Sequence, residues 1–289
     1  MEYDAQAFAV AKDGTRIFYG SRGQGPALLL LDGIGCDGWA WNHIQPHLSR
    51  RHRVVHVHYR GHGRSGPPVD PSAIDIATLA EDSVCVLDAA KLDKAVLLAH
   101  SMGTQVALEM LRRAPERIAG LALICGSYGR ITHTFHGNDL LHRVLPTLIE
   151  HVQKHKGVAR ALWSRLPPQF AFKVAGWLGE IDGLALAIED FSQYVEHLSD
   201  IDLDVYLGML QKAGEHSAED MLATIDKPTL VIAAERDTFT PVDIVHALAE
   251  RIPGAEYLEL AGASHAAPLE RASSINQRID AFLTKIGWD

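Results

Sequence analysis

Ser101 lies between two small residues, in a pattern that predicts a serine nucleophile. The sequence favours an apolar strand over Ala95–Ala99 and a helix over Met102–Arg113, so the serine falls on the turn between them. Such a turn holds a serine in a strained backbone conformation, with its hydroxyl clear of the sheet. Ala99 and Gly103, two positions before and after it, are small, as closely approaching backbones require. This spacing predicts a nucleophile elbow; the simpler alternative is a serine that caps the following helix.

A serine nucleophile needs a general base and an acid that orients the base. Asp237 follows a predicted strand at Thr229–Ala233, and His265 follows another at Glu256–Leu260. Because catalytic groups gather at the carboxyl ends of parallel strands, both side chains are expected at the sheet edge that carries Ser101. We therefore predict a catalytic triad in the chain order serine, aspartate, histidine.

Each member of the predicted triad has a competing interpretation. Glu235 is a second carboxylate in the loop of Asp237, and Asp237 itself is a candidate cap for the helix that starts near Pro241. His265 on its own is compatible with an ordinary loop residue. The three residues together are far more specific than any one of them.

Acyl transfer also needs hydrogen-bond donors for the oxyanion that develops on the substrate. The backbone N–H of Met102, directly after the serine, is the first predicted donor. The second is expected in the loop Asp32-Gly33-Ile34-Gly35-Cys36, where we assign the N–H of Ile34. Cys36 has no base assigned to it, so we expect it in the pocket wall rather than as a nucleophile.

The elements around these residues alternate between strands and helices, which is typical of a doubly wound, mostly parallel α/β sheet. An N-terminal hairpin turns at Asp13-Gly14, and a continuous apolar run precedes the glycine-rich loop. The predicted strands cover Phe8–Ala11, Arg16–Gly20, Ala27–Leu31, Val54–Val57, Ala95–Ala99, Ile118–Ile124, Thr229–Ala233 and Glu256–Leu260. The predicted helices include Trp39–Ser49, Ile74–Ala90, Met102–Arg113, Pro241–Ile252 and Ala272–Ile286.

A long helical segment interrupts this alternation between two strands. We predict that residues 127–217 form an inserted helical cap, or lid, on a core domain of residues 1–126 and 218–289. The cap is rich in large apolar side chains, most of which are expected to pack on one another. A few near Phe135, Trp163 or Phe191 should face the serine. The predicted substrate-contacting residues are Gly33, Cys36, His100, Phe135 and Trp163.

Composition and charge narrow the class of protein. The formal net charge of −9 argues against nucleic acid or an anionic membrane as partner, and no apolar run spans a bilayer. The N-terminal residues lack the features of a signal peptide, so a cytoplasmic location is expected. Three separated cysteines and sixteen histidines form no metal-binding pattern, and we predict no metal site.

The chain resembles the α/β-hydrolase superfamily, in the group with a helical cap. Besides the predicted triad, the resemblance rests on Tyr59-Arg60-Gly61-His62-Gly63-Arg64-Ser65, which is similar to the family's D-x-R-G-x-G-x-S loop. The chain departs from the family at two positions. The family's aspartate falls at His58, and the His-Gly that opens its oxyanion loop is Asp32-Gly33 here. Both side chains normally support loops, and Arg60 or a histidine such as His58 is the expected partner of Asp32.

The resemblance implies hydrolysis through an acyl-enzyme, without a cofactor. Ser101 would attack, His265 would carry the proton and Asp237 would orient His265. The apolar cap favours a modest-sized apolar carboxylic ester or lactone as the small-molecule substrate. C–C bond hydrolysis, cofactor-free perhydrolysis and non-catalytic binding of a small molecule remain alternatives. Aspartate-nucleophile enzymes of the superfamily are disfavoured by Ser101, and the sequence does not indicate an oligomeric state.

Overall fold

The predicted doubly wound sheet is confirmed by the computed structural model, which describes residues 1–165, 167–169, 171–173, 181–182 and 185–289. Eight strands of the described chain form one sheet in the order β1-β2-β4-β3-β5-β6-β7-β8. The first two pairs, β1 with β2 and β2 with β4, are antiparallel, and every other pair is parallel. The strands are β1 (Ala5–Val10), β2 (Arg16–Arg22), β3 (Ala27–Leu31), β4 (Arg53–Val57), β5 (Ala95–His100), β6 (Ile118–Ile124), β7 (Thr229–Ala234) and β8 (Glu256–Leu260).

The central strands are apolar along their whole length because both faces of the sheet are covered. In β3, Leu28 and Leu30 belong to one core cluster, whereas Leu29 and Leu31 belong to the other. Successive side chains of a strand point to opposite faces, so a strand with two buried faces reads as a continuous apolar run. The uninterrupted apolar sequence of β3 therefore indicates that this strand lies in the centre of the sheet.

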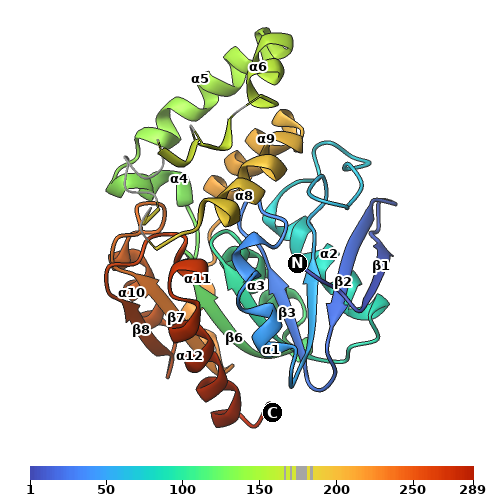
Figure 1. The fold of residues 1–289 in the computed structure, drawn as a ribbon, viewed down its shortest axis with the longest axis vertical. Coiled ribbons are helices and arrows are strands. Elements are labelled where there is room, and N and C mark those ends of the chain that lie inside the picture. The colour runs from blue at the N-terminus through green and yellow to red at the C-terminus, as the bar shows by residue number, and fades with distance from the viewer. Residues whose placement is uncertain (166, 170, 174–180, 183–184) are drawn as a thin grey trace.

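Helices pack on each face of this sheet (Figure 1). The first core cluster takes side chains from α2 (Ile76–Ala89), α3 (Gly103–Arg113) and α10 (Val242–Arg251). The second takes them from α1 (Gln45–Leu48) and α12 (Ala272–Lys285). Short helical turns complete the core: η1 (Trp39–Trp41), η2 (Pro115–Arg117), η4 (Glu219–Thr224) and α11 (Ala267–Glu270).

A helical segment between β6 and β7 rises above the carboxyl edge of the sheet (Figure 1). Its two ends are joined where Gly129 and Ser217 form an isolated antiparallel bridge. Parts of the predicted cap lie outside the described residues, so its bounds at 127 and 217 stay a prediction. The described elements are α4 (Ile131–Thr134), η3 (Phe135–Gly137), α5 (Leu140–Lys154), α6 (Lys156–Trp163), α8 (Ile188–Asp200) and α9 (Leu203–Glu215).

The single helix predicted over Trp39–Ser49 is wrong. The segment instead forms the turn η1 and the one-turn helix α1, with residues 42–44 between them. Pro46 lies in the first turn of α1, where its missing N–H costs nothing. Because proline has no N–H to donate to the carbonyl four residues earlier, the α-helix begins here rather than running through from η1.

Candidate active site

Ser101 occupies the turn between β5 and α3 with a left-handed backbone, at φ 55°. This conformation is costly for a residue with a side chain, and it persists because neighbouring strands fix the turn. The Ser101 N–H donates to the carbonyl of Ile124 at the end of β6, with 3.1 Å between N and O. Small neighbours are required on both sides. A Cβ atom on Gly103 would lie 2.3 Å from the Leu31 carbonyl oxygen, and one on Gly33 would lie 3.0 Å from Ser101 Cβ.

The structure brings Ser101, His265 and Asp237 into one chain of hydrogen bonds. His265 Nε2 lies 2.9 Å from Ser101 Oγ, and His265 Nδ1 lies 2.8 Å from Asp237 Oδ2. Asp237 follows β7 and His265 follows β8, so the three side chains meet at the carboxyl edge of the sheet. The base can thus accept the serine proton on one nitrogen while the other nitrogen donates to the carboxylate.

Asp237 is buried, and donors surround both of its oxygens. Oδ1 accepts from the backbone N–H groups of Phe239 and Thr240, each at 2.9 Å, and Oδ2 also accepts the Thr240 hydroxyl at 2.8 Å. These bonds fix the carboxylate in the orientation that faces His265. The competing carboxylate, Glu235, is exposed and instead accepts the N–H of Gly262 at 2.7 Å. The α10 helix is capped by Pro241 without a side-chain bond, so Asp237 does not serve as its cap.

The two predicted oxyanion donors lie on either side of the serine. Met102 is the N-cap residue of α3, where backbone N–H groups have no partner within the helix. Ile34 lies in the loop between β3 and η1, one residue after Gly33, which packs against Ser101. Within the described chain, neither N–H donates a hydrogen bond to the protein. This arrangement suits a negatively charged oxygen placed beside Ser101.

The structure gives Asp32 a histidine partner, but this partner is His56 rather than His58 or Arg60. Asp32 is buried, and its carboxylate accepts from Trp41 Nε1 and pairs with His56 Nε2, both at 2.7 Å. His58 instead accepts the N–H of Arg64 on Nδ1, with 3.1 Å between the nitrogens. The reason is where β3 ends: its last pair with β4 sets Leu30 opposite His56, and the chain leaves the sheet after Leu31, so the carboxylate meets His56 and not His58, which lies beyond β4.

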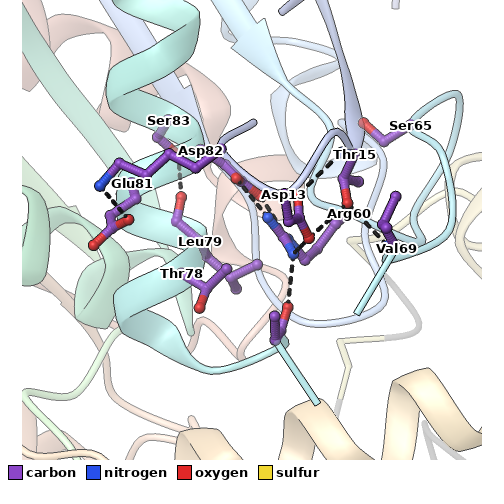
Figure 2. A network of polar contacts seen from close by, with 12 residues as sticks. Asp13, Thr15, Arg60, Ser65, Val69, Thr78, Leu79, Glu81, Asp82 and Ser83 are labelled. Atoms are coloured by element: carbon purple, nitrogen blue, oxygen red, sulfur yellow. Dashed lines mark hydrogen bonds and ion pairs between the residues drawn. The ribbon is translucent and has the colours of Figure 1, made fainter. Parts of the chain in front are cut away.

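Arg60 is engaged elsewhere, in a network of polar contacts with α2 and the turn between β1 and β2 (Figure 2). Its guanidinium forms two parallel hydrogen bonds of 2.7 Å with Asp82, on α2. It also donates to Asp13 at 2.8 Å and to the Ala73 carbonyl at 3.0 Å. This bidentate pairing anchors the loop of residues 59–65 to α2 and to the β1–β2 hairpin. Arg60 therefore acts on the site only through the loop that it holds.

Two of the predicted substrate-contacting residues are buried beside the triad. His100 is in the core, its Nε2–H donates to the His265 carbonyl at 3.0 Å, and burial lowers its pKa to about 4. His100 thus holds the backbone of the base as a neutral imidazole. Burial raises the pKa of Cys36 well above its usual value, and its sulfur accepts Trp39 Nε1 at 2.9 Å. A buried, protonated thiol is a poor nucleophile, which fits the predicted place of Cys36 in the wall of the substrate pocket.

The cap reaches the triad through aromatic rings. Phe135 packs against Phe239, with 4.9 Å between ring centroids, and Phe239 packs against the His265 imidazole at 4.8 Å. Phe239 was missed in the sequence, although it lies two residues after the predicted acid. Trp163 is further away: it packs on Tyr206 within the cap, at 5.1 Å between centroids.

Phe191, on α8, belongs to an apolar cluster that joins the cap to the core. The same cluster contains Cys36 and Trp39, which flank the loop of Ile34. A Cβ atom on Gly35 would lie 2.8 Å from the Leu198 side chain, so α8 packs directly on this loop. The cap thus covers the predicted oxyanion donors.

Among the described residues, no group of three or more His, Cys, Asp or Glu side chains is arranged to hold a metal ion. Of the described helices, none combines the length and the apolar character needed to cross a membrane.

Comparisons with known proteins agree with this geometry. Residues 26–149 match the family model described as alpha/beta hydrolase fold, and residues 208–287 match one described as TAP-like protein. A putative carbamate hydrolase, RutD, from Azorhizobium caulinodans is 28% identical over 272 residues, covering 93% of this chain and 96% of the relative.

Solved structures give the same result. A hydrolase from Pseudomonas aeruginosa superimposes with a TM-score of 0.79 at 26% identity, covering 98% of this chain and 99% of that one. An N-acyl homoserine lactone degrading enzyme superimposes with a TM-score of 0.72 at 25% identity, covering 95% and 99% of the two chains. The family-model matches, the similar proteins and the strand order of the sheet all indicate the same family. The chain belongs to the α/β-hydrolase superfamily, and it is a hydrolase.

Proposed function

We propose that this enzyme cleaves a modest-sized apolar carboxylic ester or lactone through an acyl-enzyme on Ser101. The observation that carries the proposal is the hydrogen-bonded chain from Asp237 through His265 to Ser101. The left-handed backbone of Ser101 adds to it, because strain of this kind persists where the fold over-determines a functional residue.

The proposed reaction follows from the atoms in contact. Ser101 Oγ attacks the substrate carbonyl carbon while its proton passes to His265 Nε2, and the N–H groups of Ile34 and Met102 receive the oxyanion. The tetrahedral intermediate then collapses, the bond to the leaving alcohol breaks, and the imidazolium protonates that alcohol. Water, deprotonated by His265, attacks the acyl-enzyme and returns Ser101 with a carboxylic acid product. Asp237 orients His265 and stabilises its charged form in both halves.

The substrate class is argued from the surroundings of the serine. Phe239, Phe191 and the buried Cys36 place apolar groups around the triad and its loop. Such walls mainly bury hydrocarbon, which favours an apolar acyl or alcohol group. The lactone-degrading neighbour supports an ester-type carbonyl. The carbamate hydrolase relative favours a second candidate, a carbamate, which the same nucleophile and oxyanion donors would cleave.

The test is intact mass after treatment with a small fluorophosphonate. We expect one covalent adduct on the wild-type chain, no adduct on Ser101→Ala, and an unchanged adduct on Ser273→Ala, which removes an exposed serine of α12. Ester hydrolysis should fall to background only in Ser101→Ala. A wild-type protein that is folded and not labelled would refute an activated Ser101 and favour a binding role.

A substrate panel then separates the chemistries that share this triad. Chromogenic esters of increasing chain length, homoserine lactones, carbamates and diketones are compared by kcat/KM, with perhydrolysis measured in the presence of peroxide. A preference of tenfold or more for esters or lactones supports the leading proposal. The same preference for carbamates, diketones or peroxide would replace it with the corresponding alternative.

A further inference from the structure

Asp32 begins the loop that carries the Ile34 N–H, and its carboxylate forms a buried pair with His56 of β4. The Asp32 side chain is 1% exposed and that of His56 is 0% exposed, with 2.7 Å between Oδ2 and Nε2. Trp41, which is also buried, donates its indole N–H to the other oxygen at 2.7 Å. Both bonds point N–H groups at the carboxylate, so the two donors stabilise its negative charge inside the core.

Stability alone gives a weak reason for such a pair. Removing a carboxylate and its polar partner from water costs about as much as their attraction returns, and apolar side chains of equal volume often stabilise a core as well. Buried polar pairs do fix one geometry where apolar packing allows several. The pair is therefore better explained by the backbone conformation that it fixes.

That conformation is the one of the oxyanion loop, residues 32–36. The Asp32 carbonyl accepts the Tyr59 hydroxyl at 3.1 Å, so both the side chain and the backbone of this residue are held. Three residues further on, the N–H of Gly35 donates to His62 Nε2 at 3.3 Å. The Ile34 N–H lies between these two fixed points and is the donor whose direction they set.

The pair extends away from the serine to Tyr3. His56 Nδ1 lies 2.7 Å from the Tyr3 hydroxyl, and burial raises the pKa of Tyr3 well above its usual value. The phenol thus keeps its proton and donates it to Nδ1, which leaves the hydrogen of His56 on Nε2, facing Asp32. Asp32, His56 and Tyr3 repeat the acid–imidazole–hydroxyl order of a triad, but this series lies behind the loop.

We infer that Asp32 and His56 are positioning residues for the oxyanion donor Ile34, an inference that rests on the proposed acyl-enzyme function. The acid is on the loop and the imidazole is on β4, so their hydrogen bond ties the start of the loop to the sheet.

The inference predicts a loss confined to the transition state. Asp32→Asn and His56→Gln should each lower kcat for a chromogenic ester by about 10- to 100-fold, within the range known for loss of an oxyanion donor. Affinity for a trifluoromethyl ketone, which forms a tetrahedral adduct, should fall in parallel. KM should change little, because the contacts to bound substrate are untouched. The urea midpoint should fall, because each variant breaks a buried pair.

Two further variants complete the design. Glu109→Gln is the matched control, since Glu109 is a buried carboxylate paired with Arg113 on α3, away from the oxyanion loop and from the loop of residues 59–65. It should lower the urea midpoint and leave ketone affinity within threefold of wild type. The exchange Asp32→His with His56→Asp restores an acid–imidazole pair, and its kcat should exceed that of Asp32→His alone by tenfold or more.

The outcomes separate this inference from the proposed function. If the wild type takes no fluorophosphonate, the function itself is wrong. If the wild type is labelled while both single variants keep their ketone affinity, the positioning role is refuted. Failure of both single variants to fold would refute it as well, because the pair would then be required for the fold rather than for the loop.

Discussion

Replacing the proposed triad acid with its amide, Asp237→Asn, changes one atom and tests the direction of every hydrogen bond around it. Two backbone N–H groups, from Phe239 and Thr240, donate to Oδ1. The oxygen of the amide must stay at that position, because an NH₂ group there would face two fixed donors. The new NH₂ group therefore takes the place of Oδ2, facing His265 Nδ1. The Thr240 hydroxyl can rotate to accept from it.

The consequence is the wrong tautomer of the base. An NH₂ donor facing Nδ1 requires Nδ1 to accept, so the proton of His265 moves to Nε2, which then cannot take the proton of Ser101. The same change in a serine protease lowers kcat by about 10⁴-fold. We expect kcat/KM here to fall by about 10³- to 10⁴-fold, or about 4 to 5.5 kcal/mol of transition-state stabilisation.

The assay is hydrolysis of the best chromogenic ester at pH 7 to 8, with Glu235→Gln as the matched control. Glu235 lies in the same loop, is exposed and bonds only to Gly262 among the contacts resolved for it, so its variant should stay within threefold of wild type. Near-ultraviolet circular dichroism checks that both variants are folded. A loss below tenfold in Asp237→Asn, or a larger loss in Glu235→Gln, would refute the assignment of the acid.

Three further changes probe how the site is held. Gly103→Ala should destabilise the fold by about 3 kcal/mol and lower kcat, because its Cβ would overlap a backbone carbonyl of β3. Its control is Gly157→Ala, which places a Cβ in open space on α6 and should be neutral or stabilising. Urea unfolding measures both variants. Arg60→Met should cost about 3 to 5 kcal/mol by leaving Asp82 buried without its cation, and the double variant with Asp82→Leu should recover part of that loss. His62, whose pKa burial lowers to about 4, binds a proton at pH 5 only in the unfolded chain. Stability should therefore fall from pH 7 to pH 5 by about 2 kcal/mol on its account, and unfolding of His62→Gln at both pH values should show a smaller fall.

The sequence was sufficient where a local rule decides the structure. The central strands are recognisable because both of their faces are buried, and the small residues around Ser101 are recognisable because the turn excludes larger ones. The positions of Asp237 and His265 followed from the rule that parallel strands share a carboxyl edge. None of these inferences needed a distance between remote residues.

Sequence reasoning failed where the outcome depends on the point at which an element ends. His56 lies on β4 and His58 directly follows its end, two residues further on, so the sequence did not decide which imidazole meets Asp32. The register pairs Leu30 with His56, and extending it would set Asp32 opposite His58. The chain leaves β3 after Leu31 instead, and the carboxylate meets His56. Pro46 had the same effect on the first helix, where periodicity suggested continuity and the proline set a new start.

The fold holds the proposed triad rigidly and the cap residues around it more loosely. Ser101, His265 and Asp237 are fixed by strand ends and by hydrogen bonds to backbone groups, so a small shift of the sheet would disturb all three. Among the described residues, the cap meets them by side-chain packing, at Phe135 against Phe239 and at Phe191 beside the loop. A change in the cap can therefore reshape the walls while leaving the proposed nucleophile and base in place. That division accounts for relatives at 25% to 28% identity that share the fold over nearly their whole length, while one is named for carbamates and another for lactones.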